Sequence, residues 1–478
     1  MNVIDFIKNN VKKYPKKIAL IDTERSITFQ ELFQEIQNFS SSIYLDKKNV
    51  ISLVSENSIS FVISYLGIIN SGAIVHLVSP EISETKLVNQ LKTSHSECII
   101  CDRLIKNKFL NYKSIKIPLF EFGEIISKQN ELKNEPKIND LAYLIYTSGT
   151  TSEPKGVAIS HSMIEFTTRN IVEILRYSNL DIDILPLPLH HSFGLGCLHT
   201  SLYVGSTLVL LKNANNLESV LESLKKFNAT TLAAIPATLT KLLQFEKNIL
   251  ENHFSDIRLI ITNSTSIPKK TVTNFKDILK NGNLATYYGL TEASRSTFMV
   301  FDKENGKEES VGKMAPGVEI KINKKEEDDS NVGEIMIKGK NVIKNYWDNK
   351  EADKNLINGW LKTGDRGYLD KEKYLFLKGR NDDVINIGGE KVVPSEIEEI
   401  IKQISDVKDV AVFGIKHEIF GQIIKLNVVK EENSKLDKSH ILSHCIKNLE
   451  RFQIPSKIDF VEKIPKTDYG KVKRFMLE

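Results

Sequence analysis

Cysteine is scarce in this sequence, with four residues in a chain of 478. So few cysteines cannot build a disulfide framework, which excludes the class of small secreted proteins held together by such bridges. An excess of one charge is lacking too, because 65 Lys and Arg residues stand against 61 Asp and Glu residues, for a net charge of +4. A balance this mild does not favour a nucleic acid as the partner. No signal peptide opens the sequence, so we expect a cytoplasmic protein.

Long apolar runs are also missing. One long uncharged stretch, residues 58–80, approaches membrane-spanning length, but Ser64, Asn70, Gly72 and His76 interrupt it. This pattern predicts a buried helix, a glycine turn and a strand. We therefore expect no transmembrane segment.

What the chain does contain is a regular alternation of helix-like and strand-like segments. Thr28 and Glu31 form a capping-box pair, and Leu32, Ile36 and Phe39 then line one face of a helix. Helix and strand patterns continue to alternate through the first part of the chain. This alternation predicts an α/β fold, with helices layered on mostly parallel sheets.

The pattern changes after about residue 311. Two strand-like segments, residues 318–322 and 332–338, follow each other around a charged run. Further on, Ser395 and Glu398 predict a capped helix that opens the last part of the chain. We expect a β-rich region followed by a small α+β domain.

The segment richest in chemistry is residues 146–156, YTSGTTSEPKG, which follows an apolar strand-like stretch. Backbone N–H groups and hydroxyls in such a loop can surround phosphate oxygens, and a lysine adds a positive charge. The spacing is not that of a Walker A loop, which requires GxxxxGK[ST]. The predicted phosphate-binding residues are Thr147, Ser148, Gly149, Thr150, Thr151 and Lys155.

This loop resembles the phosphate-binding loop of the adenylate-forming (ANL) superfamily, which includes acyl-CoA synthetases, peptide-synthetase adenylation domains and luciferases. The resemblance extends over about residues 6–474. The other motifs of the superfamily follow in order, at residues 190–194 (HHSFG), 288–293 (YGLTEA), 363–365 (TGD), 379–390 (GRNDDVINIGGE) and 465–471 (PKTDYGK).

The resemblance implies a domain organisation. A large N-terminal AMP-binding domain, of layered α/β subdomains and a β-rich subdomain, would span residues 1–380. Residues 381–382 would form a hinge, with Asp382 as the hinge residue. Residues 383–478 would form a small, mobile α+β domain that carries the catalytic lysine.

The nucleotide site is implied in the same way. A hydroxyl beside a carboxylate suits Mg²⁺ and phosphate, and by resemblance Glu292 helps to bind Mg²⁺ while Thr291 contacts the α-phosphate. Tyr288 would pack against adenine and Asp365 would accept the ribose hydroxyls. The resemblance adds Asn263, Ser264, Thr265, Gly289 and Arg380 to this ATP/AMP site.

Lys471 is the predicted catalytic residue. Taken alone, it belongs to a charged C-terminal run that is typical of a frayed tail. By resemblance, its side chain swings into the site and stabilises the charge that develops between the acid carboxylate and the α-phosphate. Such a fixed cation acts by electrostatic stabilisation of the transition state.

The acid site is expected around His190, His191, Phe193 and Gly194. Paired histidines invite a zinc or general-base interpretation, but neither HExxH nor a His/Cys cluster accompanies them. By resemblance these residues line the acid pocket, and His191 gates the passage between the acyl site and the thiol tunnel. Amino-acid-activating relatives commonly carry an Asp here, and this sequence has none. We therefore expect an uncharged acid, fatty or aromatic, rather than an amino acid.

One departure from the family pattern concerns the length of this pocket. Asn263, Ser264 and Thr265 stand where relatives usually show a small Gly-Gly-Ala-like run. Bulkier residues beside the acyl site would shorten the pocket, and a chain-length series of acids would test this hypothesis.

The implied reaction is ATP-dependent activation of a carboxylic acid to an acyl-adenylate, followed by transfer to the thiol of CoA. An alternative is a stand-alone adenylation enzyme that loads the acid onto the phosphopantetheine thiol of a carrier protein. A non-catalytic nucleotide-binding scaffold would predict the loss of Lys471, Glu292 or Asp365, yet all three are present. A luciferase-like oxidoreductase begins with the same adenylate, but nothing in the sequence calls for oxygen chemistry.

Overall fold

A computed structural model describes the chain except for residues 44–48, 127–137, 148–153, 264–266, 302–305, 325–330, 381–382, 388–389, 418–420, 450, 468–469, 471 and 478. The chain forms two compact units. The first contains residues 1–319 and 337–361, and the second contains residues 320–336 and 362–478. The motif-based hinge at residues 381–382 falls within the second unit and stays a prediction.

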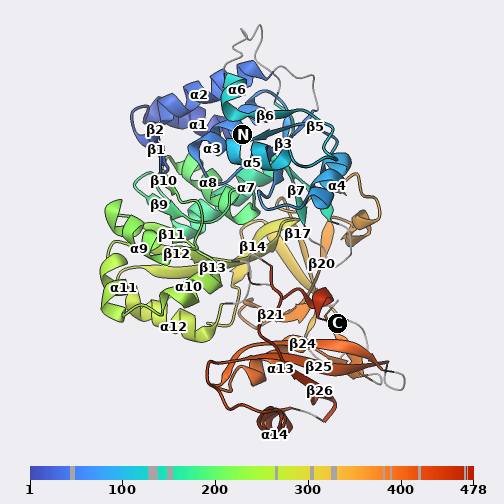
Figure 1. Cartoon of the computed structure of the whole chain (residues 1–478). Coiled ribbons are helices and arrows are strands. Elements are labelled where there is room, and N and C mark those ends of the chain that lie inside the picture. Colours follow the sequence, from blue (N-terminus) through green and yellow to red (C-terminus); the bar gives the residue numbers. More distant parts are fainter. Residues whose placement is uncertain are drawn as a thin grey trace. The chain divides into compact units, whose positions relative to one another are not determined.

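The larger sheet of the first unit has nine strands, in the order β15-β14-β13-β12-β11-β9-β10-β1-β2 (Figure 1). Its inner strands pair in parallel, and β2, β14 and β15 add antiparallel pairs at the two ends. The sheet is therefore mixed, with a parallel centre. Its strands are β1 (Ile18–Ile21), β2 (Ser26–Thr28), β9 (Ile182–Leu185), β10 (Thr207–Leu210), β11 (Thr231–Ala233), β12 (Leu259–Thr262), β13 (Asn283–Leu290), β14 (Ala293–Phe301) and β15 (Lys313–Met314).

The second sheet of the first unit has seven strands, in the order β18-β8-β7-β4-β3-β5-β6. Its strands β3 to β7 pair in parallel, and β8 and β18 pair antiparallel at one edge. The edge strand β18 comes from much later in the chain than its neighbours, and it brings Tyr346 to this sheet. The strands are β3 (Val50–Val54), β4 (Ile74–Val78), β5 (Ser96–Cys101), β6 (Leu119–Glu121), β7 (Leu141–Thr147), β8 (Lys155–Ser160) and β18 (Tyr346–Trp347).

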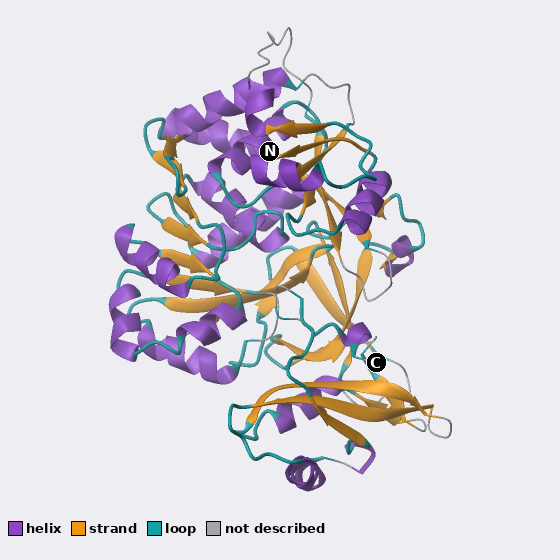
Figure 2. Cartoon of the chain, viewed as in Figure 1, coloured by secondary structure: helices purple, strands orange, loops and turns teal. Residues whose placement is uncertain are grey.

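Helices cover both sheets of the first unit (Figure 2). Helices α3 and α8 are buried on almost every side, which explains why their sequences are apolar all round rather than amphipathic. The helices are α1 (Val3–Lys13), α2 (Phe29–Ser42), α3 (Ile59–Asn70), α4 (Glu84–Ser94), α5 (Arg103–Phe109), α6 (Phe122–Ile126), α7 (His161–Leu175), α8 (Ser192–Val204), α9 (Leu217–Lys226), α10 (Pro236–Leu242), α11 (Lys247–His253) and α12 (Lys269–Ile278).

The other two sheets have five strands each, and most of their residues belong to the second unit. One runs β16-β17-β20-β19 with β21 beside β20, and the other runs β23-β22-β25-β24 with β26 beside β25. Helices α13 (Pro394–Ile401) and α14 (Lys438–Asn448) accompany the second of these sheets. The strands are β16 (Val318–Asn323), β17 (Gly333–Gly339), β19 (Leu356–Ile357), β20 (Trp360–Leu369), β21 (Leu375–Arg380), β22 (Ile385–Ile387), β23 (Glu390–Val392), β24 (Val407–His417), β25 (Gly421–Lys430) and β26 (Lys457–Phe460).

Local sequence signals predicted several of these elements correctly. The Thr28 side chain accepts from the Glu31 backbone while the Glu31 side chain accepts from the Thr28 backbone, so the capping box of α2 is confirmed. The apolar stretch at residues 58–80 is helix α3, a turn at Gly72 with φ of 90°, and strand β4. The expected α/β class, with a large N-terminal and a small C-terminal part, is confirmed.

The predicted cap of the C-terminal helix is wrong. Helix α13 starts at Pro394 with Val393 as its N-cap, and no side chain caps it. Glu398 instead accepts the backbone N–H of Val412 at 2.9 Å and a guanidinium N–H of Arg474 at 2.6 Å. A proline at the first helical position needs no cap for its own nitrogen, which releases the carboxylate for a tertiary contact.

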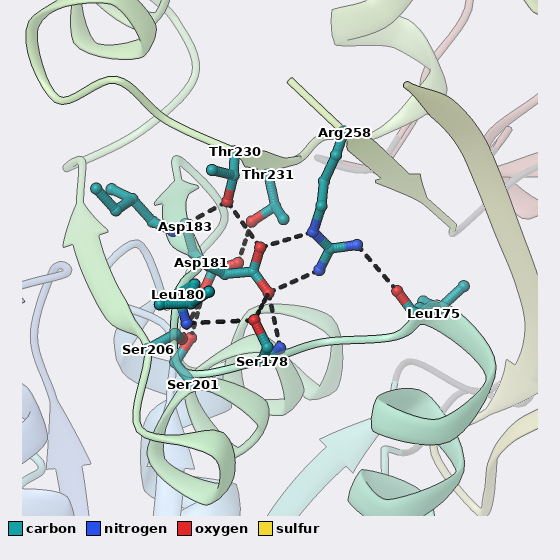
Figure 3. Close-up of polar contacts among 11 residues, drawn as sticks. Leu175, Ser178, Leu180, Asp181, Asp183, Ser201, Ser206, Thr230, Thr231 and Arg258 are labelled. Carbon is teal, nitrogen blue, oxygen red and sulfur yellow. Dashed lines mark hydrogen bonds and ion pairs between the residues drawn. The ribbon is translucent and has the colours of Figure 1, made fainter. Parts of the chain in front are cut away.

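A polar cluster joins the parallel strands of the nine-stranded sheet (Figure 3). Arg258 donates from Nε and Nη2 to the two carboxylate oxygens of Asp181, both at 2.7 Å, and from Nη1 to the Leu175 carbonyl at 3.1 Å. Asp181 also accepts from the Ser178 N–H and the Thr230 hydroxyl, each at 2.8 Å. Burial alone would raise the pKa of Asp181, but these donors hold it below its usual value.

In either unit, no helix of the described chain combines the length with the apolar character that crossing a membrane requires. The four cysteines are free thiols, and Cys98 and Cys101 are buried on β5. Burial raises the pKa of each of these two thiols to about 12.

Candidate active site

The motif at residues 288–293 forms the tip of a β-hairpin. Strand β13 ends at Leu290, strand β14 begins at Ala293, and these two residues pair across the hairpin. Thr291 and Glu292 are therefore the two residues of the connecting turn. The turn presents a hydroxyl and a carboxylate on neighbouring residues, as the proposed phosphate and Mg²⁺ contacts require.

Tyr288 and Gly289 lead β13 into this turn. Tyr288 is buried, and the pairing register shifts immediately after it. A Cβ at Gly289 would lie 2.5 Å from the backbone nitrogen of Arg295, so only glycine allows the two strands to approach this closely. Gly289 therefore shapes the hairpin, and its predicted contact with the nucleotide stays a prediction.

Glu292 lies in a small cluster with Tyr346 and Lys155. The Tyr346 hydroxyl donates to Glu292 Oε1 at 3.1 Å. Lys155 Nζ lies 5.9 Å from the centre of the Tyr346 ring, in a cation–π contact. The buried Tyr346 thus contacts both the carboxylate expected to bind Mg²⁺ and the lysine expected to bind phosphate.

Tyr346 was not anticipated from the sequence. It occupies the two-residue strand β18, where it pairs with Val157 of β8. Burial raises the pKa of its phenol, and the neighbouring Glu292 charge raises it further, so the hydroxyl stays protonated and donates. No local motif marks this position, because its role depends on an edge strand recruited from a distant segment.

The predicted phosphate loop connects strands β7 and β8. Thr147 and Lys155 pair directly across this antiparallel hairpin, so the ends of the loop are held side by side. Both of these residues are partly exposed. The intervening positions Ser148, Gly149, Thr150 and Thr151 lie outside the described residues.

The predicted acid-site histidines precede helix α8. His191 is its N-cap residue, and the rings of His190 and His191 lie 4.6 Å apart. Burial lowers the pKa of His191 to about 4 and that of His190 well below its usual value, so both are neutral near pH 7. Among the described residues, no three His, Cys, Asp or Glu side chains gather as metal ligands. The expectation of no zinc at the histidines stays a prediction.

A pocket opens beside the hairpin turn, between helix α7, helix α8 and strand β14. It shares Thr291 with the proposed nucleotide site, and α8 contributes Ser192, Gly196 and His199. The turn therefore places Glu292 in the Tyr346 cluster and Thr291 at a pocket. The full lining is Tyr143, Ile159, Met163, Ile164, Thr167, Thr168, Ile171, Ser192, Gly196, His199, Thr291, Ser294, Arg295 and Asn341.

The predicted acid-pocket residues flank this pocket without lining it. His190, His191, Phe193 and Gly194 come from the same segment as Ser192 but are not part of the lining. Phe193 instead packs edge-to-face on Tyr287, with ring centres 5.4 Å apart, and Gly194 lies in the first turn of α8. The motif thus lies beside the pocket, helical geometry selects which of its faces meets the pocket, and its role in binding the acid stays a prediction.

In the second unit, Asp365 and Arg380 form a preassembled pair. They face each other across strands β20 and β21, and Arg380 Nη1 donates to Asp365 Oδ1 at 3.1 Å. Both side chains are largely buried, with 13% of Asp365 and 21% of Arg380 exposed. Gly364 has a φ of 72°, which lets the TGD segment turn and present the Asp365 carboxylate. The sequence analysis assigned Asp365 to the ribose hydroxyls and Arg380 to the ATP/AMP site, and the structure pairs the two side chains.

Most of the remaining predicted site residues lie outside the part of the chain that the structure describes. Asn263 directly follows strand β12. Ser264, Thr265, the hinge residue Asp382 and the catalytic candidate Lys471 lie outside the described residues. Their roles therefore stay predictions.

Comparison with known families gives two matches. A family model described as AMP-binding enzyme matches residues 7–347. A second model, described as AMP-binding enzyme C-terminal domain, matches residues 396–471. Together the two matches contain most of the chain, including the hairpin turn and the position of Lys471.

Individual relatives extend over nearly the whole chain. The Long-chain-fatty-acid–CoA ligase of Haemophilus influenzae is 27% identical, over 100% of this chain and 94% of the relative. The Oxalate–CoA ligase of Arabidopsis thaliana is 28% identical, over 98% of this chain and 96% of the relative. The structure is similar to that of o-Succinylbenzoate CoA Synthetase from Bacillus subtilis in complex with an acyl-adenylate intermediate, with a TM-score of 0.88 and 26% identity over 99% of this chain and 97% of that chain.

Proposed function

The chain belongs to the AMP-binding enzyme family, and from that premise we propose that it is an acid–CoA ligase that activates a carboxylic acid with MgATP. In the first half-reaction a carboxylate oxygen attacks the α-phosphorus, an acyl–phosphate bond forms and pyrophosphate leaves. In the second, the CoA thiol attacks the acyl carbon, a thioester forms and AMP leaves. The enzyme is thus an acid–thiol ligase, and no protein nucleophile is needed.

The observation that supports this proposal is that the two residues of one turn lie in two different environments. Thr291 lines the pocket, whereas its neighbour Glu292 joins Tyr346 and Lys155. An adenylating enzyme must hold the acid carboxylate on one side of the α-phosphate and the metal and other phosphates on the other. A two-residue turn between two such regions meets this requirement, because positioning supplies much of the catalysis in reactions at phosphorus.

Mg²⁺ fits the chemistry of this cluster. The ion prefers oxygen ligands and is commonly bound by one or two carboxylates together with substrate phosphates. Glu292 supplies one carboxylate, and Tyr346 fixes one of its oxygens by a hydrogen bond. In our proposal, Glu292 holds the ion and Thr291 donates its hydroxyl to the α-phosphate. The ion, when bound, neutralises charge on the phosphate oxygens.

The rest of the nucleotide site follows the sequence prediction. We assign Thr147, Lys155 and the loop between them to the phosphates, and Tyr288 and Asn263 to the base. Asp365 binds the ribose hydroxyls, and Arg380 orients its carboxylate through the 3.1 Å hydrogen bond. Lys471 stabilises the transition state of adenylate formation, and Asp382 is the pivot of the C-terminal domain.

The acid is aliphatic or aromatic rather than an amino acid. An ammonium group on the substrate would need a carboxylate partner, and the described pocket lining contains no Asp or Glu. Relatives named for a long-chain fatty acid and for oxalate differ too much in their acids to decide the chain length. We place the enzyme in the cytoplasm, where its four free thiols would stay reduced.

The proposal is tested by pyrophosphate release from MgATP with a panel of acids, each with and without CoA. We expect acid-dependent release, and acyl-CoA formation once CoA is present. Lys471→Ala should lower the adenylation rate by about 10²–10³, the usual cost of losing one transition-state donor. The exposed residue Lys463, replaced in the same way, serves as the control and should change the rate little.

Two results would redirect the proposal. Release of pyrophosphate without acyl-CoA would point to a carrier-protein thiol as the acceptor. Equal loss of rate in the Lys463 and Lys471 variants would show that general damage to the C-terminal segment, rather than the loss of a catalytic cation, explains the effect.

A further inference from the structure

Arg295 is a charged residue in an unusual setting. It lies on strand β14, four positions after Thr291, and only 5% of its surface is exposed. Its φ of 56° falls in the left-handed region, which is costly for a residue with a bulky side chain. Strained backbone at a buried charge persists only when the surrounding structure holds it. Such strain is commonly found where a side chain must be aimed at a ligand.

The guanidinium group has only neutral acceptors among the described residues. Nη1 donates to the Ser294 hydroxyl at 2.6 Å, and Nη2 approaches the carbonyl oxygens of Ser192 and Phe193 at 3.2 and 3.4 Å. Nε is buried and has no partner. Within the described chain, no carboxylate forms an ion pair with Arg295. A buried charge without a counter-ion is expensive, so the site is electrostatically incomplete without an anion.

The group is also held in place from two sides. Its carbon Cζ lies 4.9 Å from the centre of the Tyr287 ring, in a cation–π contact. On the other side, a Cβ at Gly196 would lie 1.8 Å from Nη2, so any larger residue would displace the guanidinium. Gly196 lines the pocket together with Arg295. Helix α8 therefore leaves the space that the guanidinium occupies.

Arg295 is the only formal charge that the described residues contribute to the pocket lining. The one other titratable base there, His199, is fully buried, and its pKa is lowered to about 3, mainly by burial and also by the Arg295 charge. His199 is therefore neutral at physiological pH. Because no Asp or Glu is among the described lining residues, an anion bound there would meet one positive charge and no negative one from them.

We propose that Arg295 binds a second carboxylate on the acid substrate, so that the enzyme prefers short dicarboxylic acids. This inference rests on the proposed function. In the proposed function the reacting carboxylate meets the α-phosphate that Thr291 contacts, and four residues of chain span at most about 14 Å, so only a short acid would have its second carboxylate at Arg295. The proposal replaces the expectation of an uncharged acid and keeps the exclusion of amino acids.

The first test compares matched pairs of acids with the wild-type enzyme. Each pair differs only in a terminal carboxylate against a methyl group: succinate with butyrate, adipate with hexanoate, and terephthalate with p-toluate. We expect kcat/KM for pyrophosphate release to be at least about 10²-fold higher for the dicarboxylate of the best pair, because a buried charge left unpaired penalises the neutral analogue. This comparison needs no variant and so does not depend on the folding of a mutant.

The second test replaces the guanidinium. Arg295→Met keeps much of the side-chain volume and should lower the ratio of dicarboxylate to monocarboxylate kcat/KM by about 10²-fold. Gly196→Ala keeps the charge but forces it to move, and should lower the same ratio. Arg169→Met is the matched control, since Arg169 lies on the pocket-lining helix α7 with its side chain exposed, and the ratio should stay constant.

The possible outcomes separate the two proposals. If monocarboxylates turn over best in the wild type, the enzyme is a ligase but the role of Arg295 is refuted. If Arg295→Met lowers both members of every pair equally, Arg295 braces helix α8 and does not select the acid. If no acid of any kind gives pyrophosphate release, the proposed function itself fails.

Discussion

The hydrogen bond between Tyr346 and Glu292 allows a sharp test of the nucleotide site. Tyr346→Phe removes only the hydroxyl that donates to Glu292 Oε1 at 3.1 Å. The ring, its burial and its contact with Lys155 all remain. The variant should therefore fold normally, while the carboxylate proposed to hold Mg²⁺ loses one of the contacts that orient it. Tyr346 acts through Glu292, so it is a positioning residue.

The size of the effect follows from the nature of this bond. A hydrogen bond to a charged group contributes about 1.5–3 kcal/mol. Each 1.4 kcal/mol corresponds to a factor of about ten, so the full bond would be equivalent to roughly 10- to 100-fold in kcat/KM. Glu292 has other interactions that persist in the variant, which favours the lower part of this range. The apparent affinity for Mg²⁺ should weaken in parallel.

The assay is pyrophosphate release as a function of Mg²⁺ concentration at saturating acid. Tyr112→Phe is the control, because it removes a phenol hydroxyl that donates to the Ile82 carbonyl instead. In a Glu292→Gln background, Tyr346→Phe should cost far less than it does alone, since the two residues act as one unit. The reasoning is refuted if Tyr346→Phe leaves the Mg²⁺ dependence unchanged, or if its effect adds fully to that of Glu292→Gln.

Two further predictions concern the ion pairs of the two units. Arg258→Met should lower the free energy of unfolding by about 2–3 kcal/mol, because Asp181 is 3% exposed and keeps only its Ser178 and Thr230 donors. Urea denaturation would measure this change. The control Arg25→Met breaks an exposed ion pair and should lower the free energy of unfolding by under about 1 kcal/mol. Folding lowers the pKa of Asp181 from 3.8, so this stabilisation is present above that pH and lost as the pH falls through the folded pKa. The difference between wild type and variant should therefore shrink as the pH falls below 3.8, and a constant difference there would contradict the assignment. Asp365→Asn should raise KM for ATP by about tenfold or more with the acid KM little changed, as measured by steady-state kinetics.

Local sequence patterns determined much of this protein. The capping box of α2, the helix, turn and strand at residues 58–80, and the α/β class all follow from interactions between residues a few positions apart. Such signals can be recognised in the sequence because they arise within one turn of helix or one strand. The adenylate-forming motifs could be recognised for a related reason, because Thr291 and Glu292 are adjacent in the sequence and bring a hydroxyl and a carboxylate together.

Only the tertiary structure decided the features that join distant segments. Tyr346 reaches Glu292 because β18 pairs with β8, and Arg295 enters the pocket because Gly196 of another element leaves room for its guanidinium. The same cause overturned the predicted cap of α13, where Glu398 contacts Val412 and Arg474 instead. The sequence gives the charge and shape of each side chain, but tertiary packing determines which residue it contacts. In our proposal, the acid that the enzyme accepts depends on such a contact, because the buried Arg295 meets a pocket with no carboxylate among its described lining residues.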